Sequence, residues 1–293
     1  MYKKVLLALL ALIMTIPFVA CAAHEQTNEE LGLPSVYEIM LGVTEAQSKI
    51  STYQFDMYMN IDATTNASNE SFDGTILMGI NGAIDLENSQ MSMDMNMIME
   101  DLSEDDFSLS MGMYVVDEFM YIMTDIPEMG PMWMKMEMPI LDWGEFDQID
   151  SQIELLVDAV EVNVIGSEEI KGIVCYVLEI IPDMEQLWQI AMQQSGITGE
   201  EMLPEINEDF ISQMFKDFSV TQWIAKDTYL LTKVKIDMNM EVTPEAMGFP
   251  GETGSMAMEI TIDLFAYDYN QPVSIELPQG AENAIDMPLF SGF

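Results

Sequence analysis

Apolar and polar residues alternate strictly along residues 91–99, where five methionines stand at every second position. The stretch reads Met91-Ser92-Met93-Asp94-Met95-Asn96-Met97-Ile98-Met99. Because successive side chains of an extended strand project from opposite faces, the five methionines share one face of a β-strand. The same spacing recurs at Met57/Met59, Met111/Met113, Met132/Met134/Met136/Met138, Met238/Met240 and Met256/Met258. The pattern therefore predicts a sheet with one apolar, methionine-lined face.

Other alternating stretches, separated by polar turns, predict about eleven strands in an antiparallel meander. We expect these strands at residues 53–63, 71–86, 91–99, 107–116, 119–124, 132–138, 160–167, 172–181, 218–224, 229–243 and 256–269. Apolar residues at helical spacing predict helices in three places, which are residues 34–49, residues 143–159, and residues 182–192 with 204–216. The expected fold class is α+β, a strand-rich sheet with helices packed on it.

The first residues have the features of a secretion signal. Lys3 and Lys4 precede an apolar run, residues 5–16, that is too short to span a bilayer. The run Phe18-Val19-Ala20-Cys21 resembles the prokaryotic lipobox, with Phe18 in the place of the usual leucine. On this interpretation Cys21 is acylated and becomes the first mature residue, and its lipid chains hold the domain on a membrane. The alternative is an ordinary signal peptide cleaved between Ala20 and Ala23.

The rest of the chain has no Pro/Gly/Ser-rich linker that would divide it. We therefore expect a signal peptide at residues 1–20, the acylated cysteine and a polar tether at residues 21–33, and one domain at residues 34–293. The expected location is extracytoplasmic and lipid-anchored, on the outer face of the cytoplasmic membrane or in the periplasm.

The charge balance is extreme, with 51 acidic residues against nine lysines and no arginine, for a formal net charge of −42. This excludes nucleic acid as a partner, because that affinity depends on Lys and Arg neutralising phosphates. It also repels the body of the protein from anionic headgroups, so membrane attachment would depend on the lipid at Cys21. Halophilic solubility and weak divalent-cation binding both remain open explanations.

Two C-terminal segments resemble the LolA-like superfamily, and most closely acidic lipoproteins of the LppX/LprG type. They are Gln222-Trp223-Ile224-Ala225-Lys226-Asp227-Thr228-Tyr229-Leu230 and Tyr267-Asp268-Tyr269-Asn270-Gln271-Pro272-Val273-Ser274-Ile275-Glu276-Leu277-Pro278. The resemblance implies a strongly curved antiparallel half-barrel of about eleven strands, with helices over the concave face and an apolar cavity between them. Members of this superfamily carry acyl chains or lipopeptides there, and the resemblance transfers no catalytic residue.

Three explanations compete for the methionine stripes. They could line a lipid-accepting cavity, since methionine is unbranched and packs around varied apolar partners. They could be ordinary core. They could bind Cu(I) through soft thioether sulfurs, although the body of the chain has no histidine to complete such a site.

The sequence offers little for catalysis, and we expect neither an enzyme nor a bound cofactor or metal. The sole histidine, His24, lies in the tether, so no Ser/His/Asp set can form in the body. Glu and Asp cluster in turns or alternate with apolar residues, which is typical of a solvated face rather than of a glycosidase pair. Cys175 lies in an apolar strand, where a thiol is usually a small core residue.

Two hypotheses for function follow. In the first, the protein binds an apolar or lipid ligand in a methionine-lined cavity. The residues expected there are Met93, Met95, Met97, Met134, Met136, Met238 and Met258, with Trp188 and Met192 from a covering helix. In the second, it is a structural or interaction lipoprotein with a filled core and an acidic surface that binds a partner protein or cations.

Overall fold

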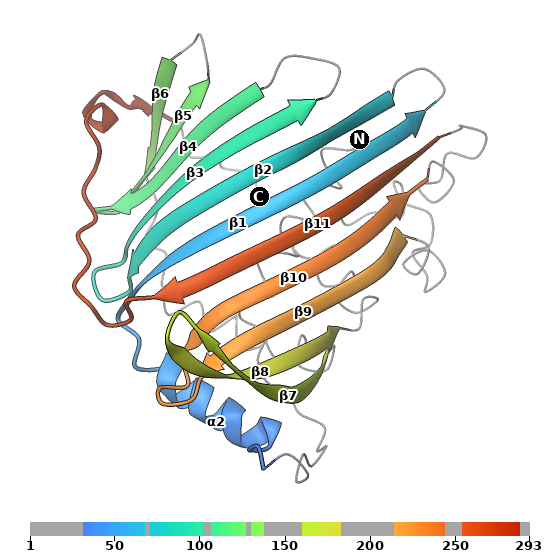
Figure 1. Cartoon of the computed structure of the whole chain (residues 1–293). Coiled ribbons are helices and arrows are strands. Elements are labelled where there is room, and N and C mark those ends of the chain that lie inside the picture. Colours follow the sequence, from blue (N-terminus) through green and yellow to red (C-terminus); the bar gives the residue numbers. More distant parts are fainter. Residues whose placement is uncertain are drawn as a thin grey trace, which may run out of the picture.

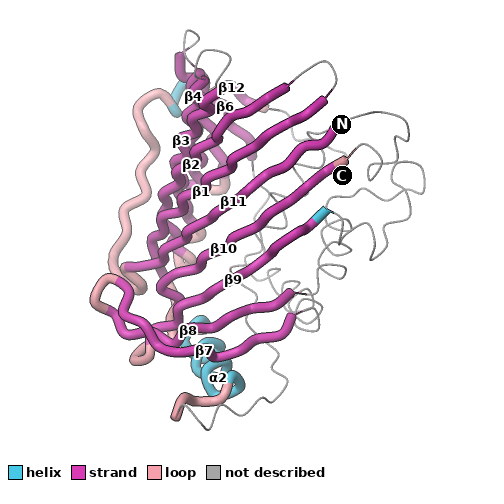
Figure 2. Tube along the Cα trace, turned by 45° about the vertical axis from the view of Figure 1, so that its right-hand side comes forward, coloured by secondary structure: helices cyan, strands magenta, loops and turns pink. Residues whose placement is uncertain are grey.

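The computed structural model describes residues 32–67, 71–101, 107–126, 130–137, 160–182, 214–243 and 254–287. These residues form one open, twisted sheet of twelve strands, with a helix, α2 (Val36–Gln47), beside its β7–β8 end (Figures 1 and 2). The strands are β1 (Thr52–Ala67), β2 (Ser71–Asp85), β3 (Gln90–Asp101), β4 (Phe107–Val116), β5 (Phe119–Ile126), β6 (Gly130–Glu137), β7 (Val160–Ile170), β8 (Ile173–Pro182), β9 (Phe215–Ala225), β10 (Leu231–Val242), β11 (Gly254–Tyr267) and β12 (Ile285–Asp286).

The sheet consists of two antiparallel meanders placed side by side. Its order is β12-β6-β5-β4-β3-β2-β1-β11-β10-β9-β8-β7, so β1–β6 and β7–β11 each follow one another in sequence. The two meanders meet where β11 pairs with β1, from Gln54 opposite Tyr267 to Ala67 opposite Gly254. β7 lies at one edge and β12 at the other, so the sheet does not close on itself.

The structure confirms a mostly antiparallel sheet and corrects two details of the expected α+β half-barrel. The described residues form twelve strands rather than about eleven, because the two residues of β12 pair in parallel with β6 and are too few to show a periodicity. β9 begins at Phe215 rather than residue 218, so Lys216 is not in a helix. A register shift between Asn239 and Met240 places Phe215 opposite Met240 and interrupts the alternation there.

Of the three expected helical regions, the first is described, and it is α2. The other two, residues 143–159 and most of residues 182–216, lie outside the described residues. A capping box begins α2: the Glu38 amide donates to Ser35 Oγ (3.2 Å), and the Ser35 amide donates to Glu38 Oε2 (2.9 Å). α2 lies by β7 and β8 (Figure 2). The expectation of helices over the concave face stays a prediction, because the other two helical regions lie outside the described residues.

The main core joins α2 to one face of the sheet. Val36, Ile39, Met40 and Val43 of α2 are buried in one cluster with apolar residues of β1, β2 and β7–β11. These four residues recur at three- and four-residue intervals, which places them on one side of the helix. The amphipathic pattern thus fixes both the helix and the face of the sheet against which it packs.

The chain after β11 runs along the end of the sheet to its opposite edge (Figure 1). The 3-10 turn η3 (Ala281–Asn283) follows Gly280, and β12 then pairs with β6. Gly280 has φ +111°, and a Cβ there would lie 2.9 Å from Trp133 Nε1, so the close approach to β6 requires glycine. This crossing covers part of β6 that would otherwise be an open edge.

Replacement of Ile39 by alanine tests the packing of α2. Ile39 is 0% exposed, so we expect Ile39→Ala to lower the free energy of unfolding by about 2–5 kcal/mol through lost burial and a residual cavity. Leu41→Ala is the matched control on the other side of the helix, where Leu41 is 54% exposed, and it should cost less than about 0.5 kcal/mol. Urea unfolding measures both, and equal effects would contradict the described packing.

Candidate functional site

The seven sheet methionines expected at the ligand site all lie on one face. Directly paired residues of antiparallel strands project from the same side, so the register traces each face across the sheet. Met95 pairs with Ile80, and Ile80 pairs with Met57. Direct pairs of the same kind, followed from strand to strand, connect the other expected methionines to this face. We call this side of the sheet the methionine face; it carries Met93, Met95, Met97, Met134, Met136, Met238 and Met258.

Burial divides the methionine face into two parts. On β1 and β10 its methionines are buried, as is Met258 of β11; Met238 is 1% exposed and Met258 is 8% exposed, whereas Met256 at the start of β11 is half-buried. On β2–β6 they are half-buried, and Met132 is 41% exposed. We call this second group the methionine band; its members are Met78, Met91, Met93, Met95, Met97, Met99, Met111, Met113, Met120, Met132, Met134 and Met136. The band is apolar surface that the protein leaves partly accessible.

The other expected site residues lie outside the described residues. These are Cys21, Trp188 and Met192. Among the described residues, no helix is long and apolar enough to cross a bilayer.

Gln222 of β9 also lies on the methionine face, where sequence reasoning did not single it out. It pairs with Leu178 of β8 and with Val234 of β10, both of them core residues. Its side chain is 1% exposed, and its Nε2 has no hydrogen-bond acceptor. The available signal was its position two residues from both Val220 and Ile224, which predicts an apolar side chain at this place in the strand.

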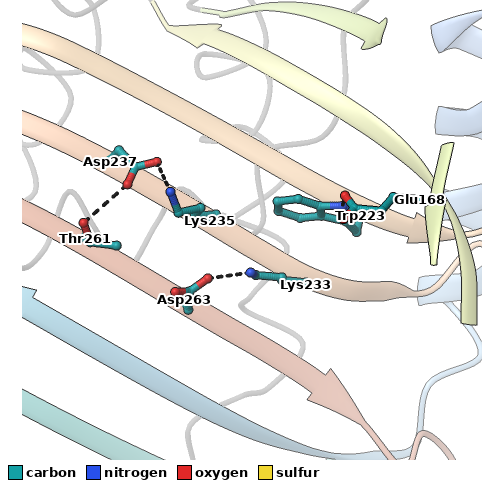
Figure 3. Close-up of polar contacts among 7 residues, drawn as sticks. All are labelled: Glu168, Trp223, Lys233, Lys235, Asp237, Thr261 and Asp263. Atoms are coloured by element: carbon teal, nitrogen blue, oxygen red, sulfur yellow. Dashed lines mark hydrogen bonds and ion pairs between the residues drawn. The ribbon is translucent and has the colours of Figure 1, made fainter. Parts of the chain in front are cut away.

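The opposite face of the sheet carries paired charges (Figure 3). Lys233 Nζ lies 2.7 Å from Asp263 Oδ1, and Lys235 Nζ lies 2.7 Å from Asp237 Oδ2. Trp223 Nε1 donates a 2.8 Å hydrogen bond to Glu168 Oε2, which joins β9 to β7. These lysines neutralise neighbouring acids within a strongly acidic chain.

The acidic residues do not converge on a metal site within the described parts of the chain. No group of three or more His, Cys, Asp or Glu side chains is placed there to hold an ion. The described residues therefore provide no cation site for the second hypothesis.

A tyrosine holds the opposite face of β3 and β4 together. Tyr114 Oη donates a 2.6 Å hydrogen bond to Asp94 Oδ1. Burial is the largest cause that raises the pKa of Tyr114, and the neighbouring Asp94 carboxylate raises it further. Asp94 alternates along β3 with Met93 and Met95, so this bond fixes the strand from the side opposite the methionine band. On β1, in the row of paired residues next to that of Tyr114, burial raises the pKa of Tyr53 to about 12.

Cys175 is a core residue, as expected from its apolar strand. It is 0% exposed and packs with Val177 and Trp223, and its Sγ donates a weak 3.4 Å hydrogen bond to the Ile173 carbonyl oxygen. Burial is the main cause that raises the pKa of the thiol. A raised pKa lowers the thiolate fraction, so the residue is poorly suited to act as a nucleophile.

A hollow of about 300 Å³ lies between α2 and the turn that joins β9 to β10. Its lining includes Glu45, Lys49 and Asn270 with the ring of Tyr229. The hollow has a mixed lining that includes charged side chains and no methionine, and it lies away from the methionine band, so it is not the methionine-lined cavity expected from the sequence.

One protein-family model matches the chain. It describes a family of unknown function (DUF6612) and covers residues 175–285. No curated protein matches the sequence.

Solved structures similar to this chain include two mycobacterial lipoproteins. LppX of Mycobacterium tuberculosis is 14% identical with a TM-score of 0.34, over 82% of this chain and 97% of LppX. LprF of Mycobacterium bovis is 14% identical with a TM-score of 0.41, over 83% of this chain and 96% of LprF. A putative outer membrane lipoprotein-sorting protein domain from Vibrio parahaemolyticus is 13% identical with a TM-score of 0.22, over 81% of this chain and 93% of the domain. These are proteins of the kind that the sequence resemblance named.

Thiol labelling tests the environment of Cys175. In the mature chain with Cys21→Ser, Cys175 is the single thiol, and we expect it to react with Ellman's reagent at pH 8 only after unfolding in urea. The reason is its burial together with its raised pKa. Rapid labelling of the folded protein would contradict the described core position.

Proposed function

We propose that the protein is an extracytoplasmic lipoprotein that binds an apolar or lipid ligand against its methionine face. One observation carries the proposal: the members of the methionine band share one face and stay half-buried or, at Met132, exposed, whereas the methionines of β1 and β10 and Met258 of β11 are buried. A band that served only as core would be expected to be covered as fully as the rest of the face. A partly accessible apolar surface that continues over several strands is typical of a binding surface, which supports the proposal.

The magnitude of apolar burial limits what such a surface can bind. A ligand that covers about 400 Å² of apolar surface gains about 10 kcal/mol at about 25 cal/mol per Å². Association itself costs about 4–15 kcal/mol in lost motional freedom and ordering. Contact with one or two methionines is therefore insufficient, and the ligand must be large enough to cover several strands. Long acyl chains meet this requirement.

Methionine suits a guest of this kind for two reasons. Its unbranched side chain changes rotamer at little cost, so the same surface can pack against chains of different length and saturation. Its thioether is polarisable and makes good dispersion contacts with an alkyl chain. Val or Ile, which usually favour strands, would make a stiffer surface.

Each expected residue keeps a role in this proposal. Met93, Met95, Met97, Met134 and Met136 contact the guest directly, because they belong to the half-buried methionine band. Met238 and Met258 form the deeper floor. Trp188 and Met192 cover the guest from above, and acylated Cys21 holds the domain on the outer face of the cytoplasmic membrane or in the periplasm.

Native mass spectrometry of the mature Cys21→Ser chain, purified from a lipid-containing host, tests the proposal. We expect a bound mass that organic extraction identifies as a lipid. The double variant Met95→Asp/Met97→Asp should reduce loading at least about tenfold, because a carboxylate buried against an alkyl chain loses its hydration without gaining a partner. Met95→Leu/Met97→Leu should retain loading, since it keeps the apolar surface.

The matched control adds the same two charges to the same strand on its other face. Ser92→Asp/Asn96→Asp should leave loading unchanged, because Ser92 and Asn96 alternate with the methionines of β3. Equal loss in both double variants would contradict the proposed face. A clean ligand-free mass from folded protein, still clean after incubation with lipid vesicles, would favour the structural or interaction lipoprotein instead.

A further inference from the structure

Gln222 is a polar side chain buried in the middle of the methionine face. Its row on the sheet runs from Leu178 through Gln222 to Val234 and then to Leu264 and Met57. The other four members of this row are apolar, and Gln222 is as buried as its two direct partners, at 1% exposed. Nothing on this face explains an amide at that position through packing alone.

The Gln222 amide nitrogen has no partner. Nε2 is buried and donates no hydrogen bond, although a side-chain amide carries two N–H donors. A buried donor without an acceptor destabilises a fold, and native proteins retain few of them. Those that persist need an explanation, and one that fits a ligand-binding face is an acceptor supplied by the ligand.

The placement of lysines indicates the kind of acceptor. All seven lysines after residue 31 are described, and the chain has no arginine. None of the seven occupies a strand position on the methionine face. Lys135, Lys216, Lys233 and Lys235 lie on the opposite face, Lys171 and Lys226 lie in turns, and Lys49 follows α2. A carboxylate or phosphate on the methionine face would be buried without a counterion, whereas a neutral carbonyl needs only a donor.

We propose that Gln222 is a ligand-binding residue whose Nε2 donates a hydrogen bond to the carbonyl oxygen of a neutral acyl ester. The proposal rests on the proposed function and adds to it the polar end of the guest. In the free protein Nε2 is covered by apolar side chains. When the ester binds, its carbonyl oxygen takes their place and accepts the hydrogen bond. The alkyl chain of the ester then extends along this row toward the methionine band, whose Met95 lies in the same row, five strand spacings, or about 24 Å, from Gln222.

A paired comparison of an ester and a hydrocarbon tests the role of Gln222. The mature Cys21→Ser chain and its Gln222→Met variant are titrated with methyl palmitate and with hexadecane, which have a similar alkyl chain but differ in the carbonyl. We expect Gln222→Met to weaken binding of methyl palmitate by about three- to tenfold, the range for one hydrogen bond, and to leave hexadecane unchanged. The unliganded variant should melt at a higher temperature, since methionine removes the unpaired donor and keeps the volume.

Leu178→Met is the matched control, a volume-conserving change at the directly paired position in the same row. It should change the affinities for methyl palmitate and hexadecane equally. Higher stability of Gln222→Met with no selective loss of the ester would overturn the proposal and leave Gln222 as a buried polar residue without a ligand role. Palmitate that binds the parent chain at pH 8 as tightly as methyl palmitate would overturn the neutral head group. A parent chain that binds neither methyl palmitate nor hexadecane would instead overturn the proposed function itself.

Discussion

The pairing of β1 with β11 is the contact on which the remainder of the sheet depends. Every other antiparallel pair joins strands that follow one another in the chain, whereas β1 and β11 bring together residues about 200 positions apart, such as Met57 and Leu264. Its register fixes which side chains of one meander continue the face of the other. A slip of one residue would turn the methionines of β1–β6 away from the apolar residues of β7–β11, so burial of both halves holds the register in place.

The two faces of this sheet divide the physical tasks between them. The opposite face carries paired charges such as Lys233 with Asp263, and the Tyr114–Asp94 hydrogen bond. The methionine face carries the core beside α2 and the half-buried band on β2–β6. Because the two sets of residues alternate along the same strands, polar contacts on one side hold the strands while the side chains on the other remain adaptable. A flexible apolar surface on a fixed backbone suits a guest that varies in shape.

Gln222 departs from this division, which is why it is informative. Its paired neighbours Leu178 and Val234 are apolar, as is usual on the methionine face. No lysine after residue 31 occupies a strand position on that face. An amide supplies hydrogen-bonding capacity without charge, so it is the least costly way to place one donor in an apolar surface. Sites where a local rule is broken without evident compensation are where function is expected.

The sequence by itself determined the strands, their faces and the start of α2. Alternation at Met91–Met99 fixes the faces of β3, and Ser35 with Glu38 marks the helix start, since both signals are local. The tertiary structure decided what depends on distant residues. It placed β11 beside β1, shifted the register at Met240, began β9 at Phe215, and paired β12 with β6. It also separated buried Met238 from half-buried Met97, and it showed Gln222 without a partner. Periodicity reports which side a residue faces; how deeply it is covered depends on chain segments remote in sequence.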